Sequence, residues 1–325
     1  MKKWLKFIFG ILISAILLYF VFKKVEISLV VKNLKETKLS YIFLCIILGF
    51  LLLFIRSYRW KIFISEYKFF DIFKFFESTS IGLFFNNILP FRMGDFVQAY
   101  VLSRKTQIQK SLTFSTVLME RFIDLFPPII FIIIGSFFII LPKQISIFFS
   151  VVVLVLLIFG FFLLLKLKNF IINFLERASL KYRIFTKIKN ILKNFYSAVE
   201  NFKNFKLLIK VLFLTLLLWS GYSIGMFLVC KSLNIDLPSL WAGFLIQAIT
   251  AVSVAIPSSP GYIGSWEFMA MLSLTIFKVE KTKALSFALL SHILGMFPVI
   301  ILGIFFIMKE ITVIKGIKEE SFYEN

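Results

Sequence analysis

The sequence contains few of the residues from which metal sites and disulfide frameworks are built. It has one histidine, His292, and two cysteines, Cys45 and Cys230, among 325 residues. A tetrahedral zinc site needs about four nitrogen or sulfur ligands at short spacings, which three such distant residues cannot supply. Both cysteines lie inside apolar stretches, where free thiols behave as small hydrophobic side chains. We therefore expect no metal, no cofactor and no disulfide.

Acidic residues are also scarce. Asp and Glu number 17 against 37 Lys and Arg, so the formal net charge is 37 − 17 = +20. A strongly basic chain often binds nucleic acid, but here the basic residues cluster between apolar stretches. Anionic lipid headgroups are therefore the expected counter-charge, and no nucleic-acid partner is expected. A nucleophile motif and a phosphate-binding glycine loop are missing as well, which argues against an enzyme.

Apolar residues, by contrast, are abundant. They make up 60% of the chain, the mean hydropathy is +0.94, and phenylalanine alone contributes 44 residues. This exceeds what a soluble core of this length requires. The composition predicts an all-α polytopic membrane helix bundle, with residues 1–310 as a single transmembrane domain and residues 311–325 as a charged tail.

Apolar stretches of suitable length predict the spans of this bundle. The first, 1–22, also fits a signal peptide, but no small-residue cleavage site precedes Lys23, so we expect a retained helix. The stretch 112–141 would be about 45 Å long as a straight helix, longer than a bilayer core of ~30 Å. We therefore expect a kink at Pro127 and Pro128. The other predicted apolar segments are 41–55, 145–165, 211–230, 240–256 and 284–308.

One stretch among these spans, 81–104, cannot cross a bilayer by itself. It is interrupted by polar and turn-forming residues, namely Asn86, Asn87, Pro90, Arg92, Gly94 and Asp95. Proline removes a backbone hydrogen-bond donor, glycine permits a sharp turn, and broken backbone at membrane depth is tolerated only inside protein or beside a wet cavity. We therefore predict a re-entrant segment. Its candidate binding residues are Asn87, Arg92 and Asp95, and Pro90 and Gly94 are the expected turns.

A second interruption follows the apolar segment 240–256. Only ten residues, 268–277, separate Glu267 from the next lysine, too few to span a bilayer. Two such breaks in corresponding places of two halves point to a transporter site and suggest an inverted repeat. Free backbone N–H groups at a short helix start favour an anion. The candidate binding residues here are Ser258, Ser259 and Glu267, and the expected structural turns are Pro257, Pro260, Gly261 and Gly264.

Three charged residues fall inside the long apolar stretch 112–141. They are Glu120, Arg121 and Asp124, and we add them to the candidate binding residues. Arg121 is close enough to pair with Asp124 at a helical spacing of three. An unpaired charge at membrane depth costs at least ~2.5 kcal/mol, so these side chains should face the protein interior or water. The alternative for the whole set is a static buried charge network that holds broken helices in place.

Two arginines and a tryptophan follow the segment 41–55. Arg56, Arg59 and Trp60 fit an anchor of this helix end at the lipid headgroups. Arg56 and Arg59 also share one helix face, so the alternative is that they hold a lipid phosphate at the mouth of a cavity. His292 lies in the last span, where it is either a hydrogen-bonded interior histidine or a proton relay.

Residues 166–210 form a strongly basic segment. They carry eleven Lys and Arg against two Glu, and apolar residues between 184 and 202 fall on one helical stripe. This pattern predicts an amphipathic helix on the cytoplasmic leaflet or one packed on the underside of the bundle, and both can hold together. The charge rule places this segment inside but does not decide whether 81–104 re-enters or spans. We favour re-entry because its polar residues would be costly in lipid.

The residues at both breaks and at the buried charges resemble those of a known family. They are Asn87, Pro90, Arg92, Gly94, Asp95, Glu120, Arg121, Asp124, Pro257, Pro260, Gly261, Gly264 and Glu267. In this order they resemble the membrane region of lysylphosphatidylglycerol synthases and of stand-alone flippase-like proteins, over about residues 5–308. The resemblance implies a bundle with re-entrant helices that moves a lipid between leaflets. The aminoacyl-transferring soluble domain has no counterpart in these residues, and the pattern departs at Tyr262, where glycine is expected.

Three functions remain open at this point. The first is a lipid translocase in the cell membrane, in which Arg92 or Arg121 holds the phosphate of an anionic headgroup and the acids organise the arginines or bind an amine. The second is a membrane enzyme that uses Asp95, Asp124 or Glu267 as acid or base on a lipid-linked substrate. The third is a non-transporting partner of a glycosyl or aminoacyl transferase, and a homo-oligomer is left open as well. For the first, alanine at Arg92 or Asp124 is expected to abolish leaflet exchange while the protein still folds.

Overall fold

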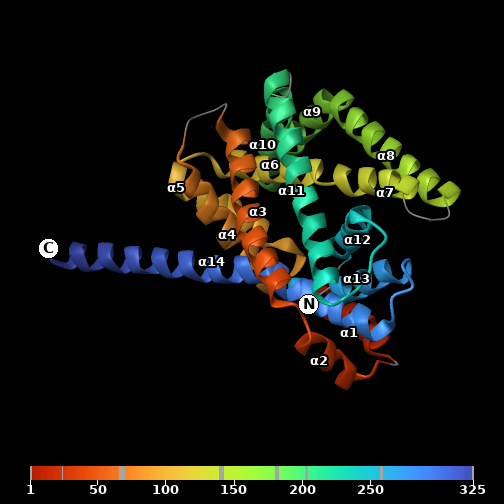
Figure 1. Cartoon of the computed structure of the whole chain (residues 1–325). Coiled ribbons are helices and arrows are strands. Elements are labelled where there is room, and N and C mark those ends of the chain that lie inside the picture. Colours follow the sequence, from red (N-terminus) through yellow and green to blue (C-terminus); the bar gives the residue numbers. More distant parts are fainter. Residues whose placement is uncertain are drawn as a thin grey trace.

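The computed structural model describes residues 2–23, 25–65, 70–138, 143–179, 183–201, 204–256 and 259–323. Throughout these ranges the chain forms α-helices, short 3₁₀-helices and the loops that join them, with no strand (Figure 1). The all-α fold class expected from the composition is confirmed. Of the residues singled out above, Pro257 and Ser258 lie outside the described residues.

The helices are numbered in chain order. The α-helices are α1 (Lys2–Phe22), α2 (Ile27–Lys35), α3 (Leu39–Ser65), α4 (Ile72–Ile88), α5 (Gly94–Thr106), α6 (Lys110–Ile123), α7 (Phe126–Phe138), α8 (Lys143–Lys166), α9 (Lys168–Ser179), α10 (Arg183–Asn201), α11 (Phe205–Ser232), α12 (Leu240–Ala251), α13 (Ser265–Thr275) and α14 (Lys281–Tyr323). The 3₁₀-helices are η1 (Pro90–Arg92), η2 (Val252–Ala255) and η3 (Pro260–Tyr262).

Three described stretches are long and apolar enough to cross a membrane. They lie in α3, α11 and α14 and cover Leu39–Ile64, Phe205–Ser232 and Lys281–Glu310. Each contains one of the apolar segments predicted from the sequence. α3 and α11 pack against each other, and the small residue Gly221 permits the contact, because a Cβ built there would lie 2.3 Å from Cδ2 of Leu52.

α4 and α5 form a tightly packed helical hairpin. The chain turns between them through Leu89, η1 and Met93. The close contact requires glycine, because a Cβ at Gly94 would lie 2.0 Å from the carbonyl oxygen of Gly82. The interruption predicted at Pro90 is therefore present as the turn of a hairpin. α12 and α13 form a second pair of packed helices, joined through η2 and η3.

The predicted long helix over 112–141 is divided rather than kinked. α6 ends at Ile123, and α7 begins at Phe126, so each half is only 14 or 13 residues long. Pro127 and Pro128 fall in the first turn of α7, where a missing backbone N–H breaks no helical hydrogen bond. The prolines therefore start a new helix instead of bending a continuous one. The break also places Asp124, which follows α6 directly, at a helix end.

The basic segment forms α9 and α10, and α10 packs on α6. Ser115 of α6 donates its hydroxyl to the carbonyl oxygen of Ile191 at 2.7 Å. Phe195, on the predicted apolar stripe, packs against the buried cluster that contains Trp60. The stripe therefore faces the bundle, as the packing alternative predicted. Its relation to a lipid leaflet stays a prediction.

α14 continues past residue 310, the predicted end of the membrane domain. It extends as one helix to Tyr323, and its last part projects away from the other helices (Figure 1). A cluster of ion pairs fastens it to the first hairpin near residue 309. Nζ of Lys309 lies 2.8 Å from Oε1 of Glu77, and Lys105 pairs with both Glu77 and Glu310. The open end of the hairpin, which is the end opposite its turn and carries Glu77 and Lys105, therefore lies beside this part of α14.

Candidate functional site

The turn of the first hairpin brings Arg92 and Asp95 together. Leu89 is extended, with φ −96° and ψ 141°, as expected for a residue before proline. Arg92 has a φ of +55°, an uncommon conformation for a residue with a side chain, which the surrounding contacts must hold. Nε of Arg92 lies 3.9 Å from Oδ2 of Asp95 in the first turn of α5.

The described part of the second turn contains three residues with positive φ. Gly261, Tyr262 and Gly264 have φ angles of +69°, +60° and +90°. Tyr262 is the position at which the resemblance led us to expect glycine, and its left-handed backbone gives the physical reason. The N–H of Ser259 donates to Oγ of Ser14 in α1 at 2.8 Å. Sequence reasoning gave Ser14 no role, because it lies in an apolar helix far from the turn.

The two turns lie against each other. η3 contacts both η1 and α4, and a Cβ built on Gly261 would lie 3.2 Å from the carbonyl oxygen of Asn87. Asn87 thus reaches the second turn through its backbone. The two interruptions predicted from the sequence therefore meet in one junction.

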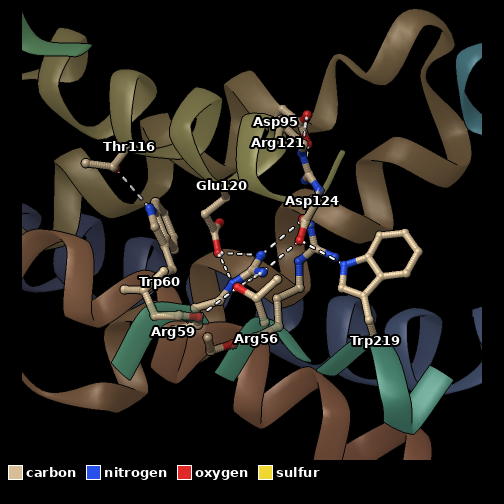
Figure 2. Close-up of polar contacts among 12 residues, drawn as sticks. Arg56, Arg59, Trp60, Asp95, Thr116, Glu120, Arg121, Asp124 and Trp219 are labelled. Carbon is tan, nitrogen blue, oxygen red and sulfur yellow. Dashed lines mark hydrogen bonds and ion pairs between the residues drawn. The ribbon is translucent and has the colours of Figure 1, made fainter. Parts of the chain in front are cut away.

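A buried network centred on Arg59 connects α3, α6 and α11 (Figure 2). Arg59, with a fully buried side chain, donates from Nη1 and Nη2 to the two carboxylate oxygens of Asp124 at 2.7 and 3.0 Å. Its Nη2 also lies 3.3 Å from Oε1 of Glu120, and its Nη1 donates to Thr215 at 3.0 Å. The indole N–H of Trp219 donates to Asp124 at 3.1 Å. Bidentate bonds and further donors are what a buried ion pair needs to offset its loss of hydration.

The predicted headgroup anchor at Arg56, Arg59 and Trp60 is wrong in position. α3 does not end at Trp60 but continues to Ser65. Trp60 is fully buried and donates its indole N–H to the hydroxyl of Thr116 at 3.0 Å, while Arg59 holds the two acids of α6. These side chains face α6 and not a lipid interface, because α3 packs against that helix.

Arg121 links the network to the first hairpin (Figure 2). Its Nε and Nη2 donate to the two carboxylate oxygens of Asp95 at 3.0 and 2.7 Å, and its Nη1 lies 3.9 Å from Oδ2 of Asp124. The predicted pairing of Arg121 with Asp124 is thus present but looser than the pairing with Asp95. Asn86 donates its side-chain amide to Asp95 at 2.9 Å, a role that we had not assigned to it.

The cations of this network outnumber the anions. Its members are Arg56, Arg59, Arg92 and Arg121 against Asp95, Glu120 and Asp124. Counted as ionised, they sum to 4 − 3 = +1. Nε and Nη2 of Arg56 and Nε of Arg92 are buried without a hydrogen-bond partner, as is Oε2 of Glu120. Arg56 is close enough to Arg92 for their charges to interact. Side-chain exposure rises from 0% at Arg59 to 36% at Arg92, so the network is most open at Arg92.

Glu267 has a different set of partners, at the second turn. Its Oε1 lies 2.5 Å from Nδ1 of His292, and its Oε2 accepts the N–H of Gly264 at 2.7 Å. Nε2 of His292 lies 2.9 Å from the carbonyl oxygen of Gly261. Trp266 stacks on the imidazole with 5.2 Å between the ring centroids. His292 is therefore hydrogen-bonded inside the bundle, which does not exclude a role in proton transfer, and Glu267 is bonded to it rather than to the arginines.

Sequence reasoning found the acids and Arg121 but missed the side chains that α11 contributes. Thr215 and Trp219 are four residues apart and so lie on one face of that helix. A polar pair at that spacing in an apolar helix was the available signal. For Arg59, the shared helix face with Arg56 was recognised, but its burial depends on how α3 and α6 pack.

These features define an integral membrane protein whose helices enclose a network of arginines and carboxylates. The sequence pattern described as "Lysylphosphatidylglycerol synthase TM region" matches residues 7–303. The chain therefore belongs to the family of that name, as the resemblance of its motifs implied.

Three relatives are similar to this chain over at least 96% of their own length. The UPF0104 membrane protein MJ1595 of Methanocaldococcus jannaschii is 27% identical over 325 residues, covering 94% of this chain and 96% of the relative. The UPF0104 membrane protein MJ1078 of the same organism is 28% identical over 251 residues, covering 74% of this chain and all of the relative. The UPF0104 membrane protein PH1989 of Pyrococcus horikoshii is 23% identical, covering 95% and 97%. No solved structure shows a significant match.

Proposed function

We propose that this protein is a lipid translocase that passes the phosphate headgroup of an anionic phospholipid through the junction of the two turns. One observation carries the proposal: the buried network has a surplus positive charge, and Arg56 and Arg92 keep nitrogen atoms without hydrogen-bond partners. A phosphate offers several acceptor oxygens to such donors. The headgroup would enter at Arg92, where the network is most exposed, while the acyl chains stay in the bilayer.

The depth of the junction supports a re-entrant arrangement of both hairpins. α14 gives a measure of depth in the membrane, because its stretch Lys281–Glu310 is long enough to cross a bilayer. His292, which contacts the second turn, lies eleven residues from one end of this stretch, or about 17 Å at 1.5 Å per residue. Lys309, which pairs with Glu77 at the open end of the first hairpin, lies at the other end. The turns would thus sit well inside a bilayer while that open end faces a surface.

The pairing of Asp95 and Asp124 favours a translocase over an enzyme that uses either of them as acid or base. A general base needs a carboxylate oxygen free to accept a proton from substrate. Asp95 accepts from Arg121 and Asn86, and Asp124 accepts from Arg59 and Trp219. The free donors, by contrast, belong to arginines, which bind anions. By the charge rule, the basic helices α9 and α10 would lie on the cytoplasmic side of the cell membrane.

Leaflet exchange in reconstituted vesicles tests this function. Vesicles of phosphatidylglycerol and phosphatidylethanolamine would carry a trace of phosphatidylglycerol labelled with a fluorophore on one acyl chain, and dithionite would quench the outer leaflet. We expect the intact protein to expose label from the inner leaflet. The double variant Arg56→Gln/Arg92→Gln should exchange lipid at least about tenfold more slowly, because each lost charged hydrogen bond is worth about 1.5–3 kcal/mol.

Arg104→Gln is the matched control, since Arg104 is an exposed arginine near the end of α5. It should exchange lipid at the rate of the intact protein. Equal rates in the double variant and the control would refute the phosphate site. Failure of the intact protein to move any lipid would refute the translocase itself.

A further inference from the structure

The hydrogen bonds of His292 require one proton more than a neutral imidazole and a carboxylate carry together. Nε2 faces the carbonyl oxygen of Gly261 at 2.9 Å, and a carbonyl only accepts, so Nε2 must hold a proton. Nδ1 faces Oε1 of Glu267 at 2.5 Å, and that contact needs a proton as well. A neutral imidazole has one N–H and an ionised carboxylate has none. The pair therefore binds a further proton, whichever of the two side chains carries it.

Loss of that proton forces a choice between the two hydrogen bonds. A neutral imidazole with a single N–H can donate to Glu267 or to Gly261, but its other nitrogen then turns a lone pair toward an acceptor. The carboxylate is the stronger acceptor of the two, because it carries a charge. The N–H would thus move to Nδ1 and remain with Glu267. The bond between Nε2 and the carbonyl oxygen of Gly261 would be lost.

That bond holds a strained turn at the junction. Gly261 and Tyr262 both have positive φ, and for tyrosine this conformation is unfavourable unless contacts maintain it. The same turn packs on Asn87 and on η1, next to Arg92. Release of Gly261 would therefore loosen the second turn where it meets the proposed phosphate site.

Few other ionisable groups face the pair. α12, residues 9–22 of α1, residues 39–55 of α3 and residues 78–88 of α4 contain no charged residue, and Glu267 is the acid of α13. α2 adds Lys32 and Lys35, and it meets α14 at Ser286. The junction of the two turns contributes two further ionisable groups among the described residues, Tyr262 of η3 and Arg92 of η1. These two interact electrostatically with each other. On α14, Lys283 is nine residues away along the helix, or about 13 Å. A proton is therefore the ligand that best fits this position.

We propose that Glu267 and His292 form a proton-binding site that couples proton movement to lipid movement by fastening and releasing the turn at Gly261. This inference rests on the proposed translocase function and names the proton as the ion that drives lipid movement. The Nε2–H bond of His292 would break as its proton leaves toward one side of the membrane, and it would form again when a proton arrives from the other side. No other covalent bond changes.

Glu267→Gln removes the extra proton but keeps the hydrogen-bond geometry of the pair. The glutamine amide can donate to Nδ1 of a neutral His292, its oxygen can accept the N–H of Gly264, and Nε2–H of His292 still donates to Gly261. Every hydrogen bond of the pair survives without the extra proton, so the variant should fold with an unchanged melting temperature. Glu36→Gln, an exposed glutamate of which 60% of the side chain is accessible, is the matched control.

The experiment uses the same vesicles with a pH difference of one unit across the membrane and the membrane potential clamped to zero. With one proton coupled to each lipid, the labelled lipid should become unevenly distributed by up to about tenfold between the leaflets. Glu36→Gln should behave like the intact protein, and Glu267→Gln should show no response to the gradient. An unchanged response in Glu267→Gln would overturn the proposal, as would lipid movement by the intact protein that ignores the gradient.

A second readout does not depend on transport. His292 is the sole histidine of the chain, so ¹⁵N-labelled histidine gives the signals of one imidazole. As the pH is raised, the intact protein should lose one proton from the pair with a change at both ring nitrogens. Glu267→Gln, in which the amide already donates to Nδ1, should not show this coupled change at the two nitrogens. Identical titrations in the two proteins would refute the proton site even if lipid transport were absent.

Discussion

Asp124→Ala is expected to destabilise the protein by about 3–5 kcal/mol, because it leaves the fully buried guanidinium of Arg59 without its bidentate partner. The same change removes the acceptor for Trp219 and the nearest acid to Arg56. Thermal unfolding of the purified protein in detergent should show a large loss in melting temperature. Asp236→Ala is the matched control, because 98% of that side chain is exposed beside Lys231, and an exposed pair contributes about 0–1 kcal/mol.

A double variant isolates the ion pair. Arg59→Met in the Asp124→Ala background removes the stranded charge, so the two losses should fall short of additivity by about 0.5–3 kcal/mol. Strict additivity, or a melting temperature for Asp124→Ala equal to that of Asp236→Ala, would contradict the network as described. This geometry also revises the expectation that Asp124→Ala folds normally. A loss of leaflet exchange in that variant would therefore report on folding. Arg56 and Arg92 are better tests of binding, because each keeps a buried nitrogen without a hydrogen-bond partner.

Gly94→Ala is the second change with a large expected effect. The added Cβ would lie 2.0 Å from the carbonyl oxygen of Gly82 and 2.5 Å from the backbone nitrogen of Asn86. Both are backbone atoms of α4, so no side chain can move aside, and the hairpin must open. Overpacking typically costs about 1–3 kcal/mol, and a clash with backbone should reach the upper part of that range.

The comparison for this change is Gly295→Ala in α14, where an added Cβ would meet no atom within 4 Å. That variant should match or slightly exceed the intact protein in melting temperature, since alanine favours a helix more than glycine does. If Gly94→Ala melted at the same temperature as Gly295→Ala, the tight packing of α4 on α5 would be refuted.

Local sequence patterns predicted the helices and turns of this fold better than they predicted which side chains pair across helices. The break at Pro90 and the apolar stripe of α10 follow from residue types and spacing within a few turns, and both are present. Arg59 and Asp124 are 65 residues apart, so their pairing depends on how α3 and α6 pack. Residue spacing within one helix does not reveal a contact between two helices, and Arg59 was therefore placed at a helix end.

The second turn shows the same limit more sharply. Glu267 and His292 were both noticed, yet their bond across 25 residues was not. The residue type alone does not reveal the positive φ at Tyr262, since tyrosine does not mark such a position as glycine would. Only the family resemblance, which predicted glycine there, pointed to it. The division of 112–141 into two helices was missed for a simpler reason. Two adjacent prolines fit a kink as well as a helix start, and only the observed end of α6 at Ile123 and start of α7 at Phe126 distinguish the two.

The static-network alternative and the translocase differ in what occupies Arg56 and Arg92. If the network only holds broken helices, these nitrogen atoms need no ligand. If it guides a headgroup, their missing partners are the phosphate oxygens. Arg59, Glu120 and Asp124 then form the fixed part of the site, and the unfilled donors of Arg56 and Arg92 form the part that binds the phosphate.

Photolabelling by a phospholipid with a diazirine on its headgroup tests this distinction most directly. In vesicles, we predict that mass spectrometry finds the label on the two turns, at residues 88–93 and 259–263, and that Arg56→Gln/Arg92→Gln removes it. Label found only on outward-facing side chains such as Phe213 and Ile304, in equal amounts in the intact protein and the double variant, would contradict a headgroup site at the junction.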